Sequence, residues 1–263
     1  MVGNDISEFQ GSIDWPTYKN NTNFVIIKAG EGNGYIDGWF GNNRSEARSL
    51  GLPRGFYHFA RPDLGNTPEA EAQFFVNLLN GQPLQEGEML CLDYEVNYHD
   101  PVGWCKMWLD IVYGLTTVKP LVYINQSTAT NNDWSPVVDA GYGLWLASYQ
   151  ADGTGETGKW PQMAMQQTGS TEQVPGIVGN VDRDVFFGDV EQFKAYGLKP
   201  VVPPTPPVEV PPTPEPVPTP VPEPIPTPIP VPEPMPIPTP VPQPVKVSWI
   251  RALIDEILKF FNL

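Results

Sequence analysis

Residues 89–95 read Met89-Leu-Cys-Leu-Asp-Tyr-Glu95, a short apolar run that ends in two acidic residues. An apolar run of this length is typical of a fully buried strand in a parallel sheet. Side chains at positions i and i+2 leave a strand on the same face, about 6.6 Å apart at ~3.3 Å per residue. We therefore expect Asp93 and Glu95 to project together from the end of this strand.

Similar apolar runs occur on both sides of this stretch, separated by longer segments with helical patterns. The other strand candidates are Phe24–Ile27, Gly55–Phe59, Pro120–Ile124 and Gly143–Ala147, and the helix candidates are Asn42–Leu50, Thr67–Leu79 and Val102–Gly114. Strands that alternate with helices at about 30-residue spacing indicate βαβ units and parallel pairing. We predict an α/β fold in the form of an irregular, incomplete β/α barrel. No glycine-rich phosphate loop opens a helix, so a nucleotide-binding sheet is not favoured.

Proline divides the 263-residue chain into three parts, because 23 of the 33 prolines lie between residues 200 and 244. We assign residues 1–199 to one folded domain and 200–244 to a rigid linker. Proline at nearly every second position enforces polyproline II, which at ~3.1 Å per residue extends on the order of 140 Å. We favour this spacer over a ligand for proline-binding modules.

The last segment, residues 245–263, contains one amphipathic helix by its period. Trp249, Ile250, Leu253 and Ile257 share its apolar face, which must be buried against something. The helix is too short to span a bilayer. Self-association, a membrane surface and a cell-envelope component are the candidates. The polar face lacks a Lys/Arg excess, which favours self-association slightly.

The charge and the few histidines and cysteines exclude several kinds of partner and chemistry. The net charge is −15 overall and −12 in residues 1–199, which argues against nucleic-acid binding. Two histidines are few for a zinc site, and we expect no metal and no cofactor. Cys91 and Cys105 are predicted to be buried thiols rather than a disulfide. No secretory signal is visible, so we expect synthesis in the cytoplasm.

The paired acids suggest glycosidic chemistry. Two close carboxylates cannot both ionise freely, so one keeps a raised pKa and can act as a general acid. Asp5 lies in residues 4–7, which open a first strand, and Asp182 lies in a strand-like run at 180–184. The two acids would line the same cleft if these first and last strands are neighbours in a closed barrel. Taken singly, each is also explained as a turn or cap residue.

Aromatic side chains supply surfaces on which sugars could stack. The candidates that lie in or just beyond predicted strands are Tyr57, Phe59, Tyr123, Trp145 and Tyr149. Core packing explains about half of them equally well. Arg61 could hold a carboxylate in place or contact substrate. His58 alternates to the face opposite Tyr57, so we expect it to be packed rather than catalytic.

At this point the chain resembles the family 25 glycoside hydrolases, the N-acetylmuramidases often called Chalaropsis-type lysozymes. The matching stretches are Asp5–Gly11, Phe24–Gly32, Gly55–Arg61, Leu92–Glu95, Pro120–Tyr123, Leu144–Tyr149 and Gly179–Asp182. They cover nearly all of residues 1–199 in order. Two positions depart from the family pattern. Gly30 stands where Thr is common, and Met165-Gln-Gln167 stands where an aromatic–Gln–aromatic run is usual.

The resemblance implies an irregular α/β barrel that cleaves the β-1,4 bond between N-acetylmuramic acid and N-acetylglucosamine in bacterial peptidoglycan. It makes Glu95 the proton donor, while Asp93 orients the reacting N-acetyl group or acts as base or nucleophile. Asp5 and Asp182 complete the acidic floor, and Gln166 is placed among the substrate contacts. Attack by the substrate's own acetamido oxygen, with net retention, is the mechanism we favour.

The role that we favour for such a muramidase is a phage endolysin that reaches the wall after release. Three other functional interpretations remain open. The first is a bacterial lysozyme exported by another route. The second is a non-catalytic glycan-binding module multimerised by its C-terminal helix. The third is a cysteine peptidase or amidase that uses Cys105 or Cys91 with His99.

Overall fold

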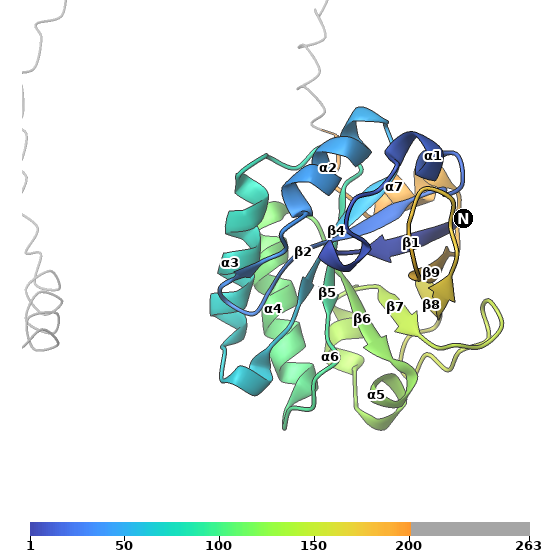
Figure 1. Ribbon diagram of the computed structural model, residues 1–263. Helices are drawn as coiled ribbons and strands as arrows, with labels where there is room; N and C mark the ends of the chain where they lie inside the picture. Colours follow the sequence, from blue (N-terminus) through green and yellow to red (C-terminus); the bar gives the residue numbers. More distant parts are fainter. Residues whose placement is uncertain (201–263) are drawn as a thin grey trace, which may run out of the picture. The chain divides into compact units, whose positions relative to one another are not determined.

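Eight strands close into a barrel in the computed structural model, which describes residues 1–200 (Figure 1). The sheet of the described residues has nine strands, the eight of the ring and β3: β1 (Val2–Ile6), β2 (Val25–Glu31), β3 (Tyr35–Ile36), β4 (Arg54–Phe59), β5 (Met89–Asp93), β6 (Leu121–Asn125), β7 (Leu144–Ala147), β8 (Met165–Glu172) and β9 (Val181–Phe186). The ring runs β1-β9-β8-β7-β6-β5-β4-β2 and closes through pairing of β1 with β2. Strand β3 is appended to β2 outside the ring. The predicted linker and C-terminal helix lie outside the described residues.

The barrel is mixed rather than wholly parallel. Neighbours from β1 through β2, β4, β5, β6 and β7 to β8 are parallel, as the βαβ spacing predicts. Strand β9 runs antiparallel to both β8 and β1. The ring of strands is therefore complete. What is incomplete is the layer of helices, since no helix follows β7 or β8 before the next strand begins.

Helices and 3-10 turns fill the other connections. They are η1 (Glu8–Gln10), α1 (Trp15–Lys19), α2 (Phe40–Ser49), η2 (Pro62–Leu64), α3 (Pro68–Asn80), α4 (Pro101–Thr116), α5 (Gln126–Asn131), α6 (Ser135–Asp139) and α7 (Val190–Ala195). The three predicted helices correspond to α2, α3 and α4. Thr67 caps α3 as expected, because its hydroxyl accepts from the backbone N–H of Ala70. Within residues 1–200 no helix has the length and apolarity that a membrane crossing requires.

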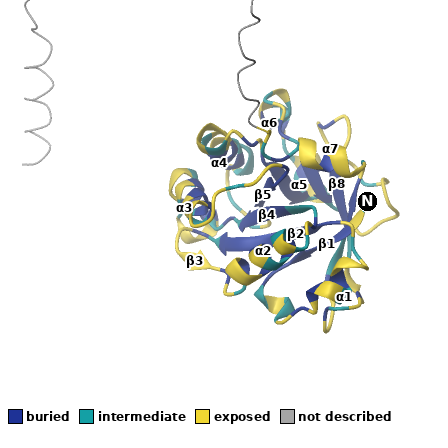
Figure 2. Cartoon of the chain, turned by 90° about the horizontal axis from the view of Figure 1, so that it is seen from above, coloured by how far each residue is buried: buried dark blue, intermediate teal, exposed yellow. Residues whose placement is uncertain are grey.

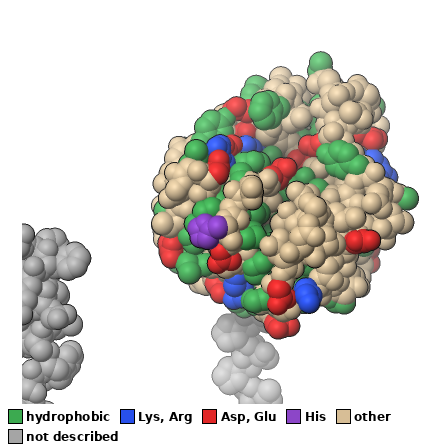
Figure 3. All heavy atoms as spheres, turned by 90° about the horizontal axis from the view of Figure 1, so that it is seen from below, with side chains coloured by type: hydrophobic (Ala, Val, Ile, Leu, Met, Phe, Trp, Pro, Cys, Tyr) green, Lys and Arg blue, Asp and Glu red, His purple; other side chains and the backbone are tan. Residues whose placement is uncertain are grey.

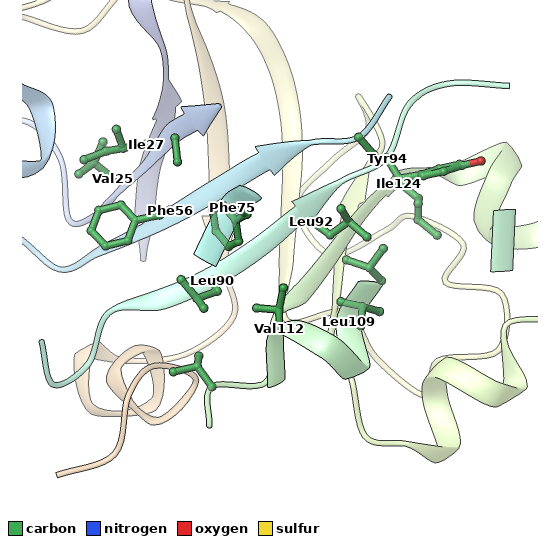
Figure 4. Close-up of a cluster of buried hydrophobic side chains, with 14 of the residues drawn as sticks. Val25, Ile27, Phe56, Phe75, Leu90, Leu92, Tyr94, Leu109, Val112 and Ile124 are labelled. Carbon is green, nitrogen blue, oxygen red and sulfur yellow. The ribbon is translucent and has the colours of Figure 1, made fainter. Parts of the chain in front are cut away.

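The larger hydrophobic core lies between the strands and the helices outside them. Figure 4 shows Val25, Ile27, Phe56, Leu90 and Leu92 of the strands together with Phe75 of α3 and Leu109 and Val112 of α4. Figure 2 shows the barrel strands largely buried, whereas β3 and the outer faces of α2, α3 and α4 are exposed.

His58 lies in this outer core, as predicted. It is fully buried and stacks on Trp108 with ring centroids 5.6 Å apart. Its Nε2 lies 2.8 Å from Oε2 of Glu71. Burial lowers the pKa of the His58 imidazole. The expectation that this histidine is packed rather than catalytic is confirmed.

A second core fills the barrel itself. Its residues are Phe24, Ile26, Tyr57, Met89, Cys91, Leu121, Tyr123, Trp145, Ala164, Met165, Phe186 and Phe193. Phe193 of α7 packs against Phe24 and Phe186 at 5.1 and 5.2 Å and closes the end at which the parallel strands begin. At the opposite end the interior becomes polar. Ligands and catalytic groups of barrel proteins are found at that end of the strands.

Candidate active site

Carboxylates gather where the parallel strands end. Asp93 is the last residue of β5, and Glu95 follows two positions later. Asp5 lies on β1, next to β9, where the register that pairs Gly3 with Asp184 continues to bring Asp5 beside Asp182. The structure thus brings together the four acids selected from the sequence.

The carboxyl groups of Asp93 and Glu95 lie close enough together that each acts on the pKa of the other. Asp93 is 7% exposed, and burial, followed by the charges of Glu95 and Asp5, raises its pKa well above the usual value. Glu95 lies exposed at the rim, yet desolvation of its carboxyl group raises its pKa as well. The hydrogen bond from Asp93 opposes that rise. The two acids therefore titrate as a pair, in which the pKa of the more buried Asp93 is raised the more strongly.

Asp5 and Asp182 form a second cluster of carboxyl groups. Burial and then the charge of Asp182 raise the pKa of Asp5. Its Oδ2 accepts a hydrogen bond of 2.9 Å from Nε2 of Gln167. Asp182 is half-buried, and its hydrogen bond with Asp5 lowers its pKa against the raising effect of burial. The charge of Asp5 also acts on Asp93 and that of Asp182 on Glu95, so the two clusters lie close together at the same end of the barrel.

The predicted aromatic contacts divide into buried and accessible groups. Tyr57, Tyr123 and Trp145 are 7%, 6% and 2% exposed and pack edge to face inside the barrel. Trp145 is too deeply buried to stack on a sugar, so that expectation is corrected. Phe59 is half-buried beside Asp93, its register partner on β5.

Exposed aromatic side chains at the same end were mostly missed by the sequence reasoning. Phe9 after β1 is 85% exposed, Tyr149 after β7 is 60% exposed and Tyr35 of β3 is 43% exposed. Each follows or adjoins the end of a barrel strand, which is the signal that could have identified Phe9 and Tyr35. Tyr149, a sequence candidate, also donates to Oε1 of Gln167 at 3.1 Å.

A cavity of about 360 Å³ adjoins the acid pair through Phe59 and Val96. Its charged lining residues are Glu8, Lys28, Glu31, Asp37, Arg61 and Asp63. Arg61 bonds to Glu31 and Asp63, so it holds carboxylates of this cavity rather than Asp93 or Glu95. Lys28 bonds to Glu31 at 2.9 Å and lies 4.9 Å from the centre of the Phe59 ring.

The two glutamines of β8 have opposite orientations. Gln166 is fully buried, donates to the carbonyl of Ser148 at 2.8 Å and accepts from the N–H of Gly153 at 2.7 Å. It therefore holds a loop, and its placement among the substrate contacts is corrected. Gln167 points the other way, where it accepts from the Tyr123 hydroxyl at 2.9 Å and donates to Asp5. Alternation along a strand separates the two.

The thiols give no support to a cysteine-based enzyme. Cys91 and Cys105 are both free and fully buried, as predicted, and burial raises the pKa of each thiol. A nucleophilic cysteine needs an accessible thiol with a lowered pKa.

On the face shown in Figure 3, acidic side chains are scattered among hydrophobic and neutral ones, and Lys and Arg form no continuous patch.

The chain is similar to several known proteins. The family described as glycosyl hydrolases family 25 matches residues 4–177. "Lysozyme M1" of Streptomyces globisporus is 30% identical over 217 residues, which span 74% of this chain and 70% of that protein. The crystal structure of a bacterial lysozyme from Streptomyces coelicolor has a TM-score of 0.66 at 28% identity, over 74% of this chain and 96% of that one. The CTP1L endolysin has a TM-score of 0.64 at 28% identity, over 74% and 69%.

Proposed function

The chain belongs to glycosyl hydrolases family 25, and from that premise we propose that it is a muramidase. Its substrate is bacterial peptidoglycan, and it cleaves the β-1,4 bond between N-acetylmuramic acid and N-acetylglucosamine. The observation that carries this proposal is the close pair of Asp93 and Glu95 where β5 ends, at the polar end of the barrel. The adjoining cavity and the exposed ring of Phe9 offer surface to a glycan chain.

Glu95 donates the proton in this mechanism, because it is the exposed member of the pair. In this scheme one proton passes from Asp93 to Glu95. Glu95 then gives a proton to the glycosidic oxygen as the bond between that oxygen and C1 breaks. Asp93 becomes a carboxylate as it gives up this proton. The Asp93 carboxylate then accepts a hydrogen bond from the N–H of the substrate's acetamido group.

The acetamido oxygen is the nucleophile in this scheme. It forms a bond to C1 while the bond to the leaving oxygen breaks, and water activated by Glu95 later opens the resulting ring. Two-carboxylate retaining enzymes separate their acids by about 5–5.5 Å and inverting ones by about 6.5–9.5 Å. Asp93 and Glu95 lie two positions apart at one strand end and act directly on each other's pKa, and this proximity favours Asp93 as the orienting group.

The stereochemistry of the first product tests this mechanism. We expect the reducing end released from a β-linked glycan to be the β-anomer, since two displacements at C1 restore the configuration. Proton NMR recorded before mutarotation measures it. An initial α-anomer would show that water attacks directly, with Asp5 or Asp182 as the base, and would exclude the acetamido nucleophile.

Digestion of purified peptidoglycan tests the function itself. The full chain should release fragments whose reducing ends are N-acetylmuramic acid, identified by borohydride reduction and mass spectrometry. Reducing ends of N-acetylglucosamine would assign the other glycosidic bond. Binding to cell walls without any soluble product would instead support the alternative, a non-catalytic glycan-binding module.

The biological setting that we propose is that of a phage endolysin, made in the host cytoplasm and acting on the wall after release. The support for it is the similarity to the CTP1L endolysin. We further propose that residues 248–263 self-associate or contact a membrane surface through their apolar face.

A further inference from the structure

Asp184 is a carboxyl group inside the barrel to which the mechanism above gives no role. It lies on β9 two positions after Asp182, so both side chains leave the strand on the same face. Asp184 is fully buried. Its Oδ1 accepts a hydrogen bond of 2.9 Å from Nε1 of Trp145, while its Oδ2 has no N–H or neutral hydroxyl donor in the described part of the chain. The remaining partner is the carboxyl group of Asp5.

Within residues 1–200, the cation whose charge acts on Asp184 is Arg183, but no Lys or Arg bonds to the Asp184 carboxyl group. The titratable groups that face it are Asp5 from β1, Asp182 on its own strand, Cys91 from β5 and Tyr18 from α1. The neighbouring Arg183 pairs instead with Asp152 at 2.8 Å. Within residues 1–200, no Lys or Arg forms an ion pair with Asp5, Asp182 or Asp184.

Two buried carboxyl groups in contact can stay together only with a proton between them. The Trp145 N–H already occupies Oδ1 of Asp184, which leaves the unpartnered Oδ2 as the atom that would carry a proton toward Asp5. Burial and then the charge of Asp5 raise the pKa of Asp184, and the hydrogen bond between them lowers that of Asp5. Asp184 therefore behaves as a neutral donor and Asp5 as the acceptor.

We propose that Asp184 is a positioning residue that remains protonated and, from beneath the groove, donates a hydrogen bond that holds the Asp5 carboxylate in place. Gln167 donates to Oδ2 of Asp5 and is itself held by Tyr123. Trp145, Asp184, Gln167 and Tyr123 thus form a polar layer under the catalytic acids. The layer explains why a tryptophan and a tyrosine that are too buried to stack on a sugar still belong to the site.

Asparagine at position 184 is the decisive substitution, because its amide donates and accepts at the same two places but cannot ionise. For activity, this test rests on the proposed function. Asp184→Asn should keep kcat/KM within about threefold of wild type. Asp184→Leu, of similar volume but without a donor, should lose about 10- to 100-fold, as expected for a buried hydrogen bond to a charged group. The acidic limb of the pH profile of Asp184→Leu should move to higher pH, because Asp5 loses a hydrogen bond that lowers the pKa of its carboxyl group.

An infrared measurement tests the protonation of Asp184 without any substrate. At neutral pH, the difference between wild type and Asp184→Asn should contain the carbonyl band of one protonated carboxyl group. Asp139→Asn, at an exposed acid at the end of α6, is the matched control and should remove only carboxylate bands.

Three results would overturn the proposal. They are a carboxylate band lost in Asp184→Asn, activity lost in a folded Asp184→Asn to the same extent as in Asp184→Leu, or full activity in Asp184→Leu. If the leucine variant does not fold, the asparagine variant and the infrared spectrum still decide. If wild type shows no turnover, the proposed function fails while the spectrum still reports on Asp184.

Discussion

Replacement of Glu95 by Gln is expected to abolish the release of reducing sugar from purified cell walls while leaving the fold intact. The glutamine amide cannot protonate the glycosidic oxygen, and loss of a general acid lowers kcat by about 10²- to 10⁴-fold. The fold should persist because Glu95 is exposed at the rim of the groove. Removal of one of the charges that act on Asp93 should also leave the thermal unfolding temperature unchanged or slightly higher.

The matched control for Glu95→Gln is Glu69→Gln, at an exposed glutamate in the first turn of α3. It removes a charge of the same type away from the groove and should retain wild-type turnover. Reducing-end release, circular dichroism and thermal unfolding measured on both variants separate chemistry from folding. Retained activity in Glu95→Gln would remove Glu95 from its role as proton donor.

Asp93→Asn should lose activity and gain stability at neutral pH. The amide cannot become the carboxylate that accepts the substrate's acetamido N–H, so we expect kcat to fall by about 10²- to 10³-fold. The stability gain follows from burial, which raises the pKa of Asp93 in the folded protein well above its value of about 3.9 in an unfolded chain. Between these two values the folded state binds a proton that the unfolded state has released.

The contribution of Asp93 to stability therefore falls as pH rises through that window. Asparagine does not titrate, so its advantage over aspartate should be largest at pH 7–8 and should vanish near pH 4. At neutral pH we expect about 1–2 kcal/mol, or roughly 2–8 °C in melting temperature. Thermal unfolding of both proteins from pH 4 to pH 8 measures the difference. A constant difference over this range would show that Asp93 does not titrate between the two states.

Local sequence was sufficient for most of the barrel's elements. Apolar runs bounded by turn residues predicted β2, β4, β5, β6 and β7, and capping and period predicted α2, α3 and α4. Strand β8 was missed because Gln, Thr, Gly and Ser dominate it and no apolar alternation marks it. Its pairing with β7 and β9 makes it a strand, and that pairing depends on contacts with distant parts of the chain.

The sequence by itself determined that an acid-bearing strand ends with Asp93 and Glu95 on one face, because the alternation of side chains along a strand is a local property. Only the tertiary structure decided which carboxyl groups hold protons and which glutamine reaches them. Gln167 meets Asp5 across 162 positions of sequence, and Asp184 meets the same residue because β9 pairs with β1. Burial and charge at these acids come from strands that are distant in the chain, and the electrostatics of the site arises only when the barrel closes.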